Sequence, residues 1–277
     1  MTIGQGEVYP GRYLAMNPGS ASGELEGLAV REPTFGVPAT WIGASQRDQA
    51  RALGYTVVDA TTVVATHLAE LARRHAPSLL TRQAVQELLD AVKASTPAAV
   101  EGLIPGLLPL GTVHKVLQLL LAEEVTIRDL PTILEAMADT AAHTKDPAVL
   151  AEWVRAAIPG SVVRPYLVEG NVLQPLVLRP GAEHALRAGL QRADTGAALA
   201  LDPNTSRTVV DAIAQAVTRR APAAGRPSLL CPGDLRPHVR RLVERALPHL
   251  GVLSFAEVPS AVTLAASTPV EVATHAN

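Results

Sequence analysis

The chain has 277 residues, and its 24 Lys and Arg against 26 Asp and Glu give a formal net charge of −2. This balance argues against a nucleic-acid-binding protein, because neutralising phosphate groups requires an excess of Lys and Arg. Apolar residues make up 48% of the chain and charged residues 18%, which supports a sizeable core and excludes a disordered chain. Cys231 is the only cysteine, so an internal disulfide is excluded. No apolar run approaches the roughly 20 residues of a membrane span.

Residues 1–59 are predicted to form short strands separated by turns. The strand signals are the stretches 7–16 and 39–42 and the β-branched run 55–58. Residues 45–48 resemble a capping box, which would begin a short helix ending near residue 53.

Helical periodicity dominates residues 60–159. His67 lies on the apolar face of the first predicted helix, where we expect a partly buried histidine with satisfied hydrogen bonds. Thr81 and Asp146 are N-cap candidates for two further helices. The predicted helices cover 61–75, begin at 82, cover 113–123 and 130–141, and begin at 147, the last with Leu150, Trp153, Val154 and Ile158 on its apolar stripe.

After residue 159, strands alternate with helices. A hairpin is predicted from 161–168 and 171–178, a strand at 198–201, and a helix beginning at Asp202. The chain beyond residue 259 is weakly patterned and is predicted to fray.

Between residues 227 and 255 the sequence predicts a strand–helix–strand unit of crossover length. Its three elements are residues 227–231, 235–247 and 252–255. Its helix has a basic face, predicted to be solvated or else to dock an acidic partner or a neighbouring subunit. The basic residues are Arg236, His238, Arg240, Arg241 and Arg245.

Motifs of known enzyme classes are absent, since the sequence has no HExxH, GxSxG or GxxxxGK[ST] pattern. The acidic pair Glu123 and Glu124 sits at a predicted helix end, where carboxylates are common as capping or solvated groups. One enzyme alternative stays open: Cys231 follows a strand and precedes a helix, a placement that lowers a thiol pKa. It has no adjacent His or CxxC partner, so a buried structural thiol is preferred.

The segment 31–41 carries Phe35 and Trp41, half of the Phe and Trp in the chain. Two prolines and a glycine hold it extended, and Phe35 stands between turn-forming residues instead of within a periodic element. Both an aromatic that borders a groove and plain core packing under a loop fit this pattern.

Several long, collinear stretches resemble the cytoplasmic part of flagellar type III export-gate proteins, the FHIPEP family. They include YPGRYLAMNPG (9–19), EPTFGVPATWI (32–42), GYTVVDATTVVATHLAEL (54–71), HKVLQLLLAEEVTIRDLPTILEAMAD (114–139) and LRPHVRRLVERALPHLGVLSFAEVP (235–259). The resemblance extends to about residue 260. The equivalent gate protein of virulence injectisomes is the alternative, and the flagellar form fits better at MNPG and FGVPATWI.

The resemblance implies an α+β chain of several subdomains. Residues 1–10 and 60–79 would be a remnant of a first subdomain, and 11–59 a small β-rich inserted subdomain. Residues 80–159 would form a helical middle subdomain, 160–260 a C-terminal α/β subdomain, and 261–277 a tail. A membrane part and the opening of the first subdomain would lie outside these residues.

The resemblance also implies a function, that of a non-enzymatic docking platform on the cytoplasmic face of the bacterial inner membrane. Family members bind export chaperones loaded with late substrates, contact other export-gate and ATPase-complex components, and assemble into a nine-membered ring. No cofactor, metal or nucleic acid is implied.

Four positions match the family's chaperone-binding dimple. These are Glu32, where the family usually has Asp, Phe35 three residues later, Thr66 on the following helix, and Pro18 at the rim. We expect the Glu32 carboxylate to accept hydrogen bonds from a partner, and Phe35 to anchor an apolar side chain.

Overall fold

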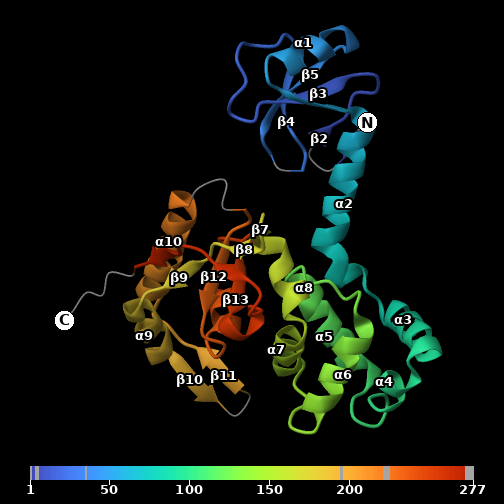
Figure 1. The fold of residues 1–277 in the computed structure, drawn as a ribbon, viewed down its shortest axis with the longest axis vertical. Coiled ribbons are helices and arrows are strands. Elements are labelled where there is room, and N and C mark those ends of the chain that lie inside the picture. The colour runs from blue at the N-terminus through green and yellow to red at the C-terminus, as the bar shows by residue number, and fades with distance from the viewer. Residues whose placement is uncertain (1, 4–5, 35, 194–195, 221–224, 272–277) are drawn as a thin grey trace. The chain divides into compact units, whose positions relative to one another are not determined.

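The computed structural model describes residues 2–3, 6–34, 36–193, 196–220 and 225–271. The chain divides into two compact units, Met1–Leu79 and Leu80–Asn277, and each is described by itself (Figure 1). The predicted subdivisions within these units stay predictions. None of the helices in the described ranges combines the length and hydropathy that a bilayer span requires.

Unit 1 is built on a four-stranded antiparallel sheet in the order β4-β5-β3-β6 (Figure 1). Two core clusters lie on opposite faces of this sheet, as strand alternation requires. Leu14 and Trp41 pack with Val63 on one face, while Ala15 and Ile42 pack with Ala50 on the other. The elements are β1 (Thr2–Ile3), β2 (Gly6–Glu7), β3 (Tyr13–Met16), β4 (Leu28–Arg31), β5 (Pro38–Ile42), η1 (Ala44–Gln46), α1 (Arg47–Ala52), β6 (Thr56–Asp59) and α2 (Ala60–Leu79).

Two predictions for this unit are corrected, and one strand was missed. The strand predicted at 7–16 is broken by a turn, in which the Arg12 amide donates to the carbonyl of Tyr9 at 3.2 Å. Strand β4 was not predicted, because it is an edge strand with mostly exposed residues and therefore lacks apolar alternation. At the start of η1 the capping contact is made by the Gln46 side chain, which accepts from the Gly43 amide at 3.1 Å, and not by residues 45 and 48.

Unit 2 begins with a helical part, in which two helices have the N-cap residues that the sequence predicts. The Thr81 hydroxyl accepts from the Ala84 amide at 3.1 Å, and the Asp146 carboxylate accepts from the Ala148 amide at 2.8 Å, so both predicted N-caps are confirmed. The helices are α3 (Arg82–Ser95), α4 (Pro97–Glu101), α5 (Leu110–Ala122), α6 (Leu130–Ala141), α7 (Pro147–Ala157) and α8 (Pro159–Val163). Helices α4 and α8 were not predicted, because single turns carry too few residues to show a period.

The rest of unit 2 is an α/β part with a parallel four-stranded sheet in the order β13-β12-β9-β15. It confirms the predicted strand–helix–strand unit, although its helix α11 ends at Val243. The elements are η2 (Arg164–Tyr166), β7 (Leu167–Val168), β8 (Val172–Leu173), β9 (Leu176–Leu178), α9 (Pro180–Ala188), β10 (Leu190–Ala193), β11 (Gly196–Leu199), α10 (Pro203–Arg219), β12 (Ser228–Cys231), α11 (Arg236–Val243), β13 (Gly251–Ser254), η4 (Phe255–Glu257), β14 (Thr263–Leu264) and β15 (Thr268–Val270).

Two predictions for this part are wrong in detail. The hairpin reduces to β7 and β8, since residues 159–163 are helical and β9 joins the parallel sheet. The chain does not fray directly after residue 259, because β15 pairs with β9 and buries Val270 completely.

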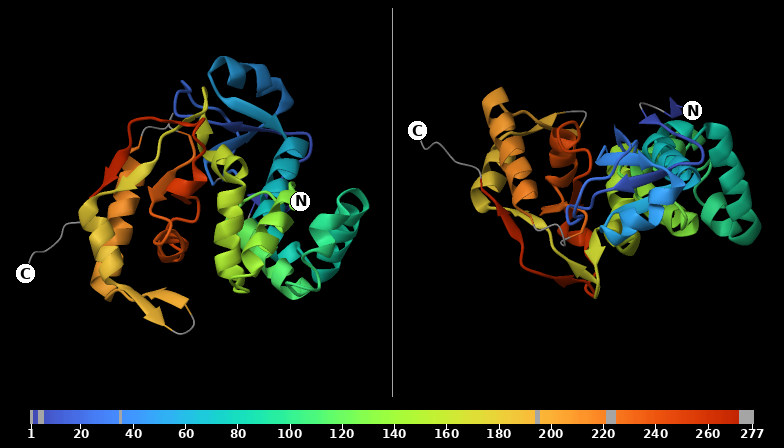
Figure 2. Two further views of the ribbon diagram at one scale, coloured as in Figure 1. Left: turned by 60° about the horizontal axis from the view of Figure 1, so that its bottom comes forward. Right: turned by 90° about the horizontal axis from the view of Figure 1, so that it is seen from above.

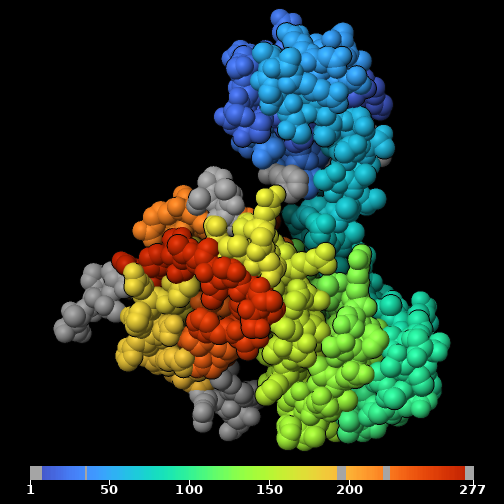
Figure 3. Space-filling model, in the orientation of Figure 1, coloured from blue at the N-terminus to red at the C-terminus, as the bar shows by residue number. Residues whose placement is uncertain are grey.

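Both faces of the parallel sheet are covered, as its fully buried strands β12 and β13 require. Leu229 and Cys231 face α9, α10 and α11, whereas Leu230 and Leu253 belong to the core of the helical part. Helices α9 and α10 accordingly lie on the side of the sheet away from α5 and α6 (Figure 2). The two parts of unit 2 meet along a continuous seam in the space-filling view (Figure 3).

Candidate functional site

The tight turn between β4 and β5 contains two of the predicted docking positions, Glu32 and Phe35. The Gly36 amide donates to the carbonyl of Glu32, and the Glu32 amide donates to the carbonyl of Val37, both at 2.8 Å. Gly36 has a φ of 68°, in the left-handed region that glycine adopts without strain. Glu32, Gly36 and Val37 are therefore joined by backbone hydrogen bonds at the base of this turn.

Glu32 stabilises this turn from within. Its carboxylate accepts from the Thr34 amide at 2.9 Å, and the residue is only 4% exposed. The Glu32 carboxylate therefore accepts a hydrogen bond within its own turn, and the expected contact with a partner stays a prediction.

Phe35, the predicted anchor, lies outside the described residues. Its neighbour Val37 is described and is 38% exposed. The Thr34 hydroxyl oxygen is buried and has no hydrogen-bond partner within the described part of the turn and its surroundings.

Pro18 and Glu32 lie at the same end of the sheet, just after the last residues of β3 and β4. Both β3 and β4 pair antiparallel with β5, so they run in the same direction, and Met16 and Arg31 pair with Ala39 and Pro38 at the start of β5. The loop after β3 is exposed at Pro18 and is held by Asn17, whose side-chain oxygen accepts from the Gly19 amide at 2.8 Å.

Thr66 lies on the long helix α2, which follows β6. The helix packs on the sheet through Val63, and Thr66 is exposed. His67 is 6% exposed, and neither ring nitrogen has a hydrogen-bond partner among the described residues, so the predicted satisfied histidine is not observed. The structure thus places Pro18, Glu32 and Thr66 in unit 1, with Pro18 and Thr66 open to solvent.

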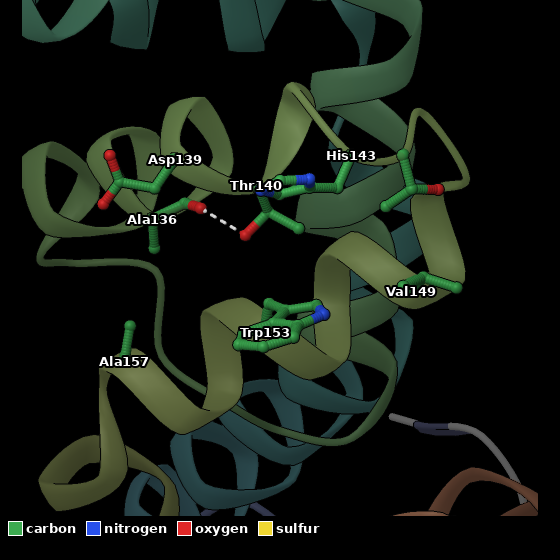
Figure 4. Close-up of a pocket in the computed structure, with 8 residues that line it drawn as sticks. Ala136, Asp139, Thr140, His143, Val149, Trp153 and Ala157 are labelled. Carbon is green, nitrogen blue, oxygen red and sulfur yellow. Dashed lines mark hydrogen bonds between the residues drawn. The ribbon is translucent and has the colours of Figure 1, made fainter.

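A second candidate surface lies between α6 and α7, and the sequence did not indicate it. Trp153 was predicted to be part of a buried stripe but is 60% exposed, and its ring lies across from Thr140 and His143 (Figure 4). The groove has a volume of about 540 Å³. It is lined by Ala136, Asp139, Thr140, His143, Thr144, Val149, Trp153 and Ala157. An exposed tryptophan in an apolar groove suits protein docking more than catalysis.

The basic helix α11 is not simply a solvated face, contrary to prediction. Arg236 is 2% exposed and donates to Glu123 at 2.7 and 3.0 Å and to Glu152. Arg155, also buried, donates to Glu123 at 3.3 Å and to Glu257. Glu123 is therefore a structural ion-pair partner and not a solvated helix end.

The candidate nucleophile Cys231 is fully buried within β12. Burial raises the pKa of its thiol to about 12, so the thiolate form is negligible at neutral pH. The described residues also contain no group of three His, Cys, Asp or Glu side chains placed to hold a metal ion.

Comparison with known proteins gives the family. A family model for the FHIPEP family matches residues 1–263. The chain belongs to the FHIPEP family. Among curated FHIPEP relatives, flagellar biosynthesis protein FlhA is 43% identical in Proteus mirabilis, 41% in Escherichia coli and 37% in Bacillus subtilis, each over 256 residues or 92% of this chain. The chain spans only 36–38% of the length of these relatives.

Solved structures of type III secretion proteins share the fold. The Chlamydia pneumoniae CdsV protein superposes with a TM-score of 0.82 at 22% identity, covering 95% of this FHIPEP chain and 76% of CdsV. The nonameric EscV cytosolic domain superposes with a TM-score of 0.71 at 25% identity, covering 93% of this chain and 76% of that domain. The predicted mixed fold, with helices and more than one sheet, is confirmed by these likenesses.

Proposed function

We propose that this chain is a docking platform of a flagellar type III export gate. It binds export chaperones that carry late substrates, and copies of it assemble into a ring at the cytoplasmic face of the inner membrane. The observation that carries this proposal is the 37–43% identity with the three flagellar relatives over nearly the whole chain. Ring formation is supported by the fold shared with the nonameric EscV domain.

The proposed chaperone surface is the part of unit 1 formed by the β4–β5 turn, the loop after β3 and the first half of α2. Two backbone hydrogen bonds join Glu32 to Gly36 and Val37 across this turn, and pre-organised surfaces bind partners at a lower entropic cost. Pro18 and Thr66 are exposed and offer an apolar ring and a hydroxyl to a partner. A role without catalysis agrees with the buried, protonated thiol of Cys231.

The second candidate is the equivalent gate component of a virulence secretion system, favoured by the TM-score of 0.82 with CdsV. A complex of CdsV with the protein CdsO has also been solved, which supports a second kind of protein partner beside the chaperones. The identity with CdsV is 22%, however, against 43% with the flagellar relative from Proteus mirabilis, so the flagellar assignment is preferred.

Isothermal titration calorimetry tests the proposal. The 277-residue chain is titrated with a flagellar export chaperone of the same organism, loaded with its substrate, and with a virulence-type chaperone complex. We expect saturable binding of the loaded flagellar complex alone. Binding of the virulence-type complex alone supports the second candidate, and binding of neither by the folded chain contradicts the docking function.

A further inference from the structure

Two acidic residues at the end of α5, Glu123 and Glu124, occupy an unfavourable local position. They follow the C-terminus of the helix, where the helix dipole disfavours negative charge. Glu124 also has a φ of 58°, in the left-handed region that residues other than glycine adopt rarely. A local cost of this kind indicates that these residues are held by partners elsewhere in the fold.

Glu123 reaches the α/β part through Arg236 on α11. The two hydrogen bonds at 2.7 and 3.0 Å form a bidentate pair, and Arg236 also donates to the carbonyl of Val252 on β13 at 3.2 Å. Glu152 on α7 holds the same guanidinium from a second helix of the helical part. One arginine thus joins α5, α7, α11 and β13.

Glu124 reaches the α/β part at a separate point. Its carboxylate pairs with Arg226, just before β12, at 2.7 Å. The Arg226 guanidinium also lies 5.3 Å from the centre of the Tyr166 ring. The two adjacent residues that follow α5 therefore contact two arginines that are ten positions apart in the chain.

Apolar packing alone does not select one orientation for the joint between the two parts. Leu230 and Leu253 bury sheet surface against the helical part, but hydrophobic contact has no preferred direction. Bidentate Arg–carboxylate pairs are directional, and in some proteins buried polar groups specify one arrangement while adding little net stability. The two kinds of contact therefore have different roles at this seam.

We propose that two ion pairs, Glu123 with Arg236 and Glu124 with Arg226, set the orientation of the α/β part on the helical part. We call these two ion pairs the lock. The lock makes the two parts of unit 2 one rigid piece. This inference rests on the contacts within unit 2 and is independent of the proposed docking function.

Distance measurements between spin labels test the lock in the full 277-residue chain. Exposed positions on α6 and α10 carry the labels, through Glu135→Cys and Asp211→Cys, while buried Cys231 stays unlabelled. The labelled chain should give one narrow distance distribution, and Glu123→Gln with Glu124→Gln should broaden it. The matched control, Lys93→Gln with Glu101→Gln, removes an exposed ion pair of the helical part and should leave it narrow.

An unchanged distribution in the folded double variant overturns the proposal. If the double variant does not fold, Glu124→Gln decides alone, because this side chain is 30% exposed and its loss leaves the Arg236 cluster intact. The distance distribution of Glu124→Gln should also broaden, and an unchanged distribution in this variant would overturn the proposal. Ile213→Val, which destabilises the core of α10 without touching the lock, should lower the melting temperature but keep the distribution narrow. Broadening in Ile213→Val would show that lost stability, and not lost orientation, causes the effect, and would overturn the proposal.

Discussion

Arg236 and Glu123 are 113 residues apart in the chain, yet their side chains pair at 2.7 Å in the seam of unit 2. Around them, Arg155 and Arg240 lie close to Glu123, and Glu152 and Glu257 complete the cluster. Three arginines face three glutamates, so the charges of this cluster balance. Stability and acid response of unit 2 should both depend on this balance.

Arg236→Ala should lower the free energy of unfolding by about 3–5 kcal/mol, because it leaves two carboxylates partly buried without their main partner. Urea unfolding followed by circular dichroism measures this change. Arg187→Ala is the control, since it removes a pair with Asp234 whose side chains are 46% and 48% exposed. The control should cost about 0–1 kcal/mol. Equal losses in both variants would contradict a special role for Arg236.

Glu123 should make the protein sensitive to acid. Burial alone would raise its pKa, but Arg155 and Arg236 outweigh burial and lower the pKa to about 2 from the ordinary value of 4.5. Because the folded pKa is depressed, the stabilisation is present above about pH 4.5 and is lost as the pH falls towards 2. Glu123→Gln should therefore flatten the loss of stability on acidification.

Glu152→Gln provides the opposite control for this pH dependence. Burial raises the pKa of Glu152, so its protonation on acidification favours the folded state. Removing that carboxyl should steepen the acid loss instead of flattening it. Denaturant unfolding at a series of pH values measures both slopes, and a flatter slope in Glu152→Gln would refute this assignment.

The two tryptophans should behave differently on truncation. Trp41 is 1% exposed, and its ring centre lies 5.8 Å from that of Tyr9. Trp41→Ala should therefore lower the free energy of unfolding by about 3–5 kcal/mol. Trp153 is 60% exposed, and Trp153→Ala should change stability by no more than about 0.5 kcal/mol. Thermal melts of the two variants compare them, and a large loss in Trp153→Ala would show that the α6–α7 groove is closed by packing.

Glu32 should position the β4–β5 turn. Glu32→Ala removes the acceptor for the Thr34 amide, which should speed hydrogen exchange of that amide and cost about 1 kcal/mol. Glu32→Gln keeps a side-chain oxygen and should protect the amide more than Glu32→Ala does. Equal exchange in wild type and Glu32→Ala would show that this hydrogen bond does not order the turn.

Features decided by neighbouring residues could be predicted from the sequence, whereas those decided by distant contacts could not. Thr81, Asp146 and Asp202 cap their own helices, and a cap needs only the next three residues. The burial of Arg236 depends on carboxylates more than 80 residues away. Trp153 follows the helical period of α7, but the period does not reveal how wide the covered face is.

The same distinction applies to the candidate site. Family resemblance predicts a docking region at the turn and α2, and the sequence explains why Gly36 suits the turn. It could not show that the Glu32 carboxylate accepts from the Thr34 amide, because that depends on backbone geometry two residues ahead.

The affinity of the Phe35→Ala chain for a loaded flagellar export chaperone tests the central claim most directly. Calorimetry should show binding weakened by about 2 kcal/mol or more, as for an aromatic at the centre of an interface. Val37→Ala removes an exposed apolar side chain from the same turn and should change the affinity by less than about 1 kcal/mol. Equal affinities for wild type and Phe35→Ala would contradict the account, as would a Phe35→Ala chain that binds normally but melts many degrees lower.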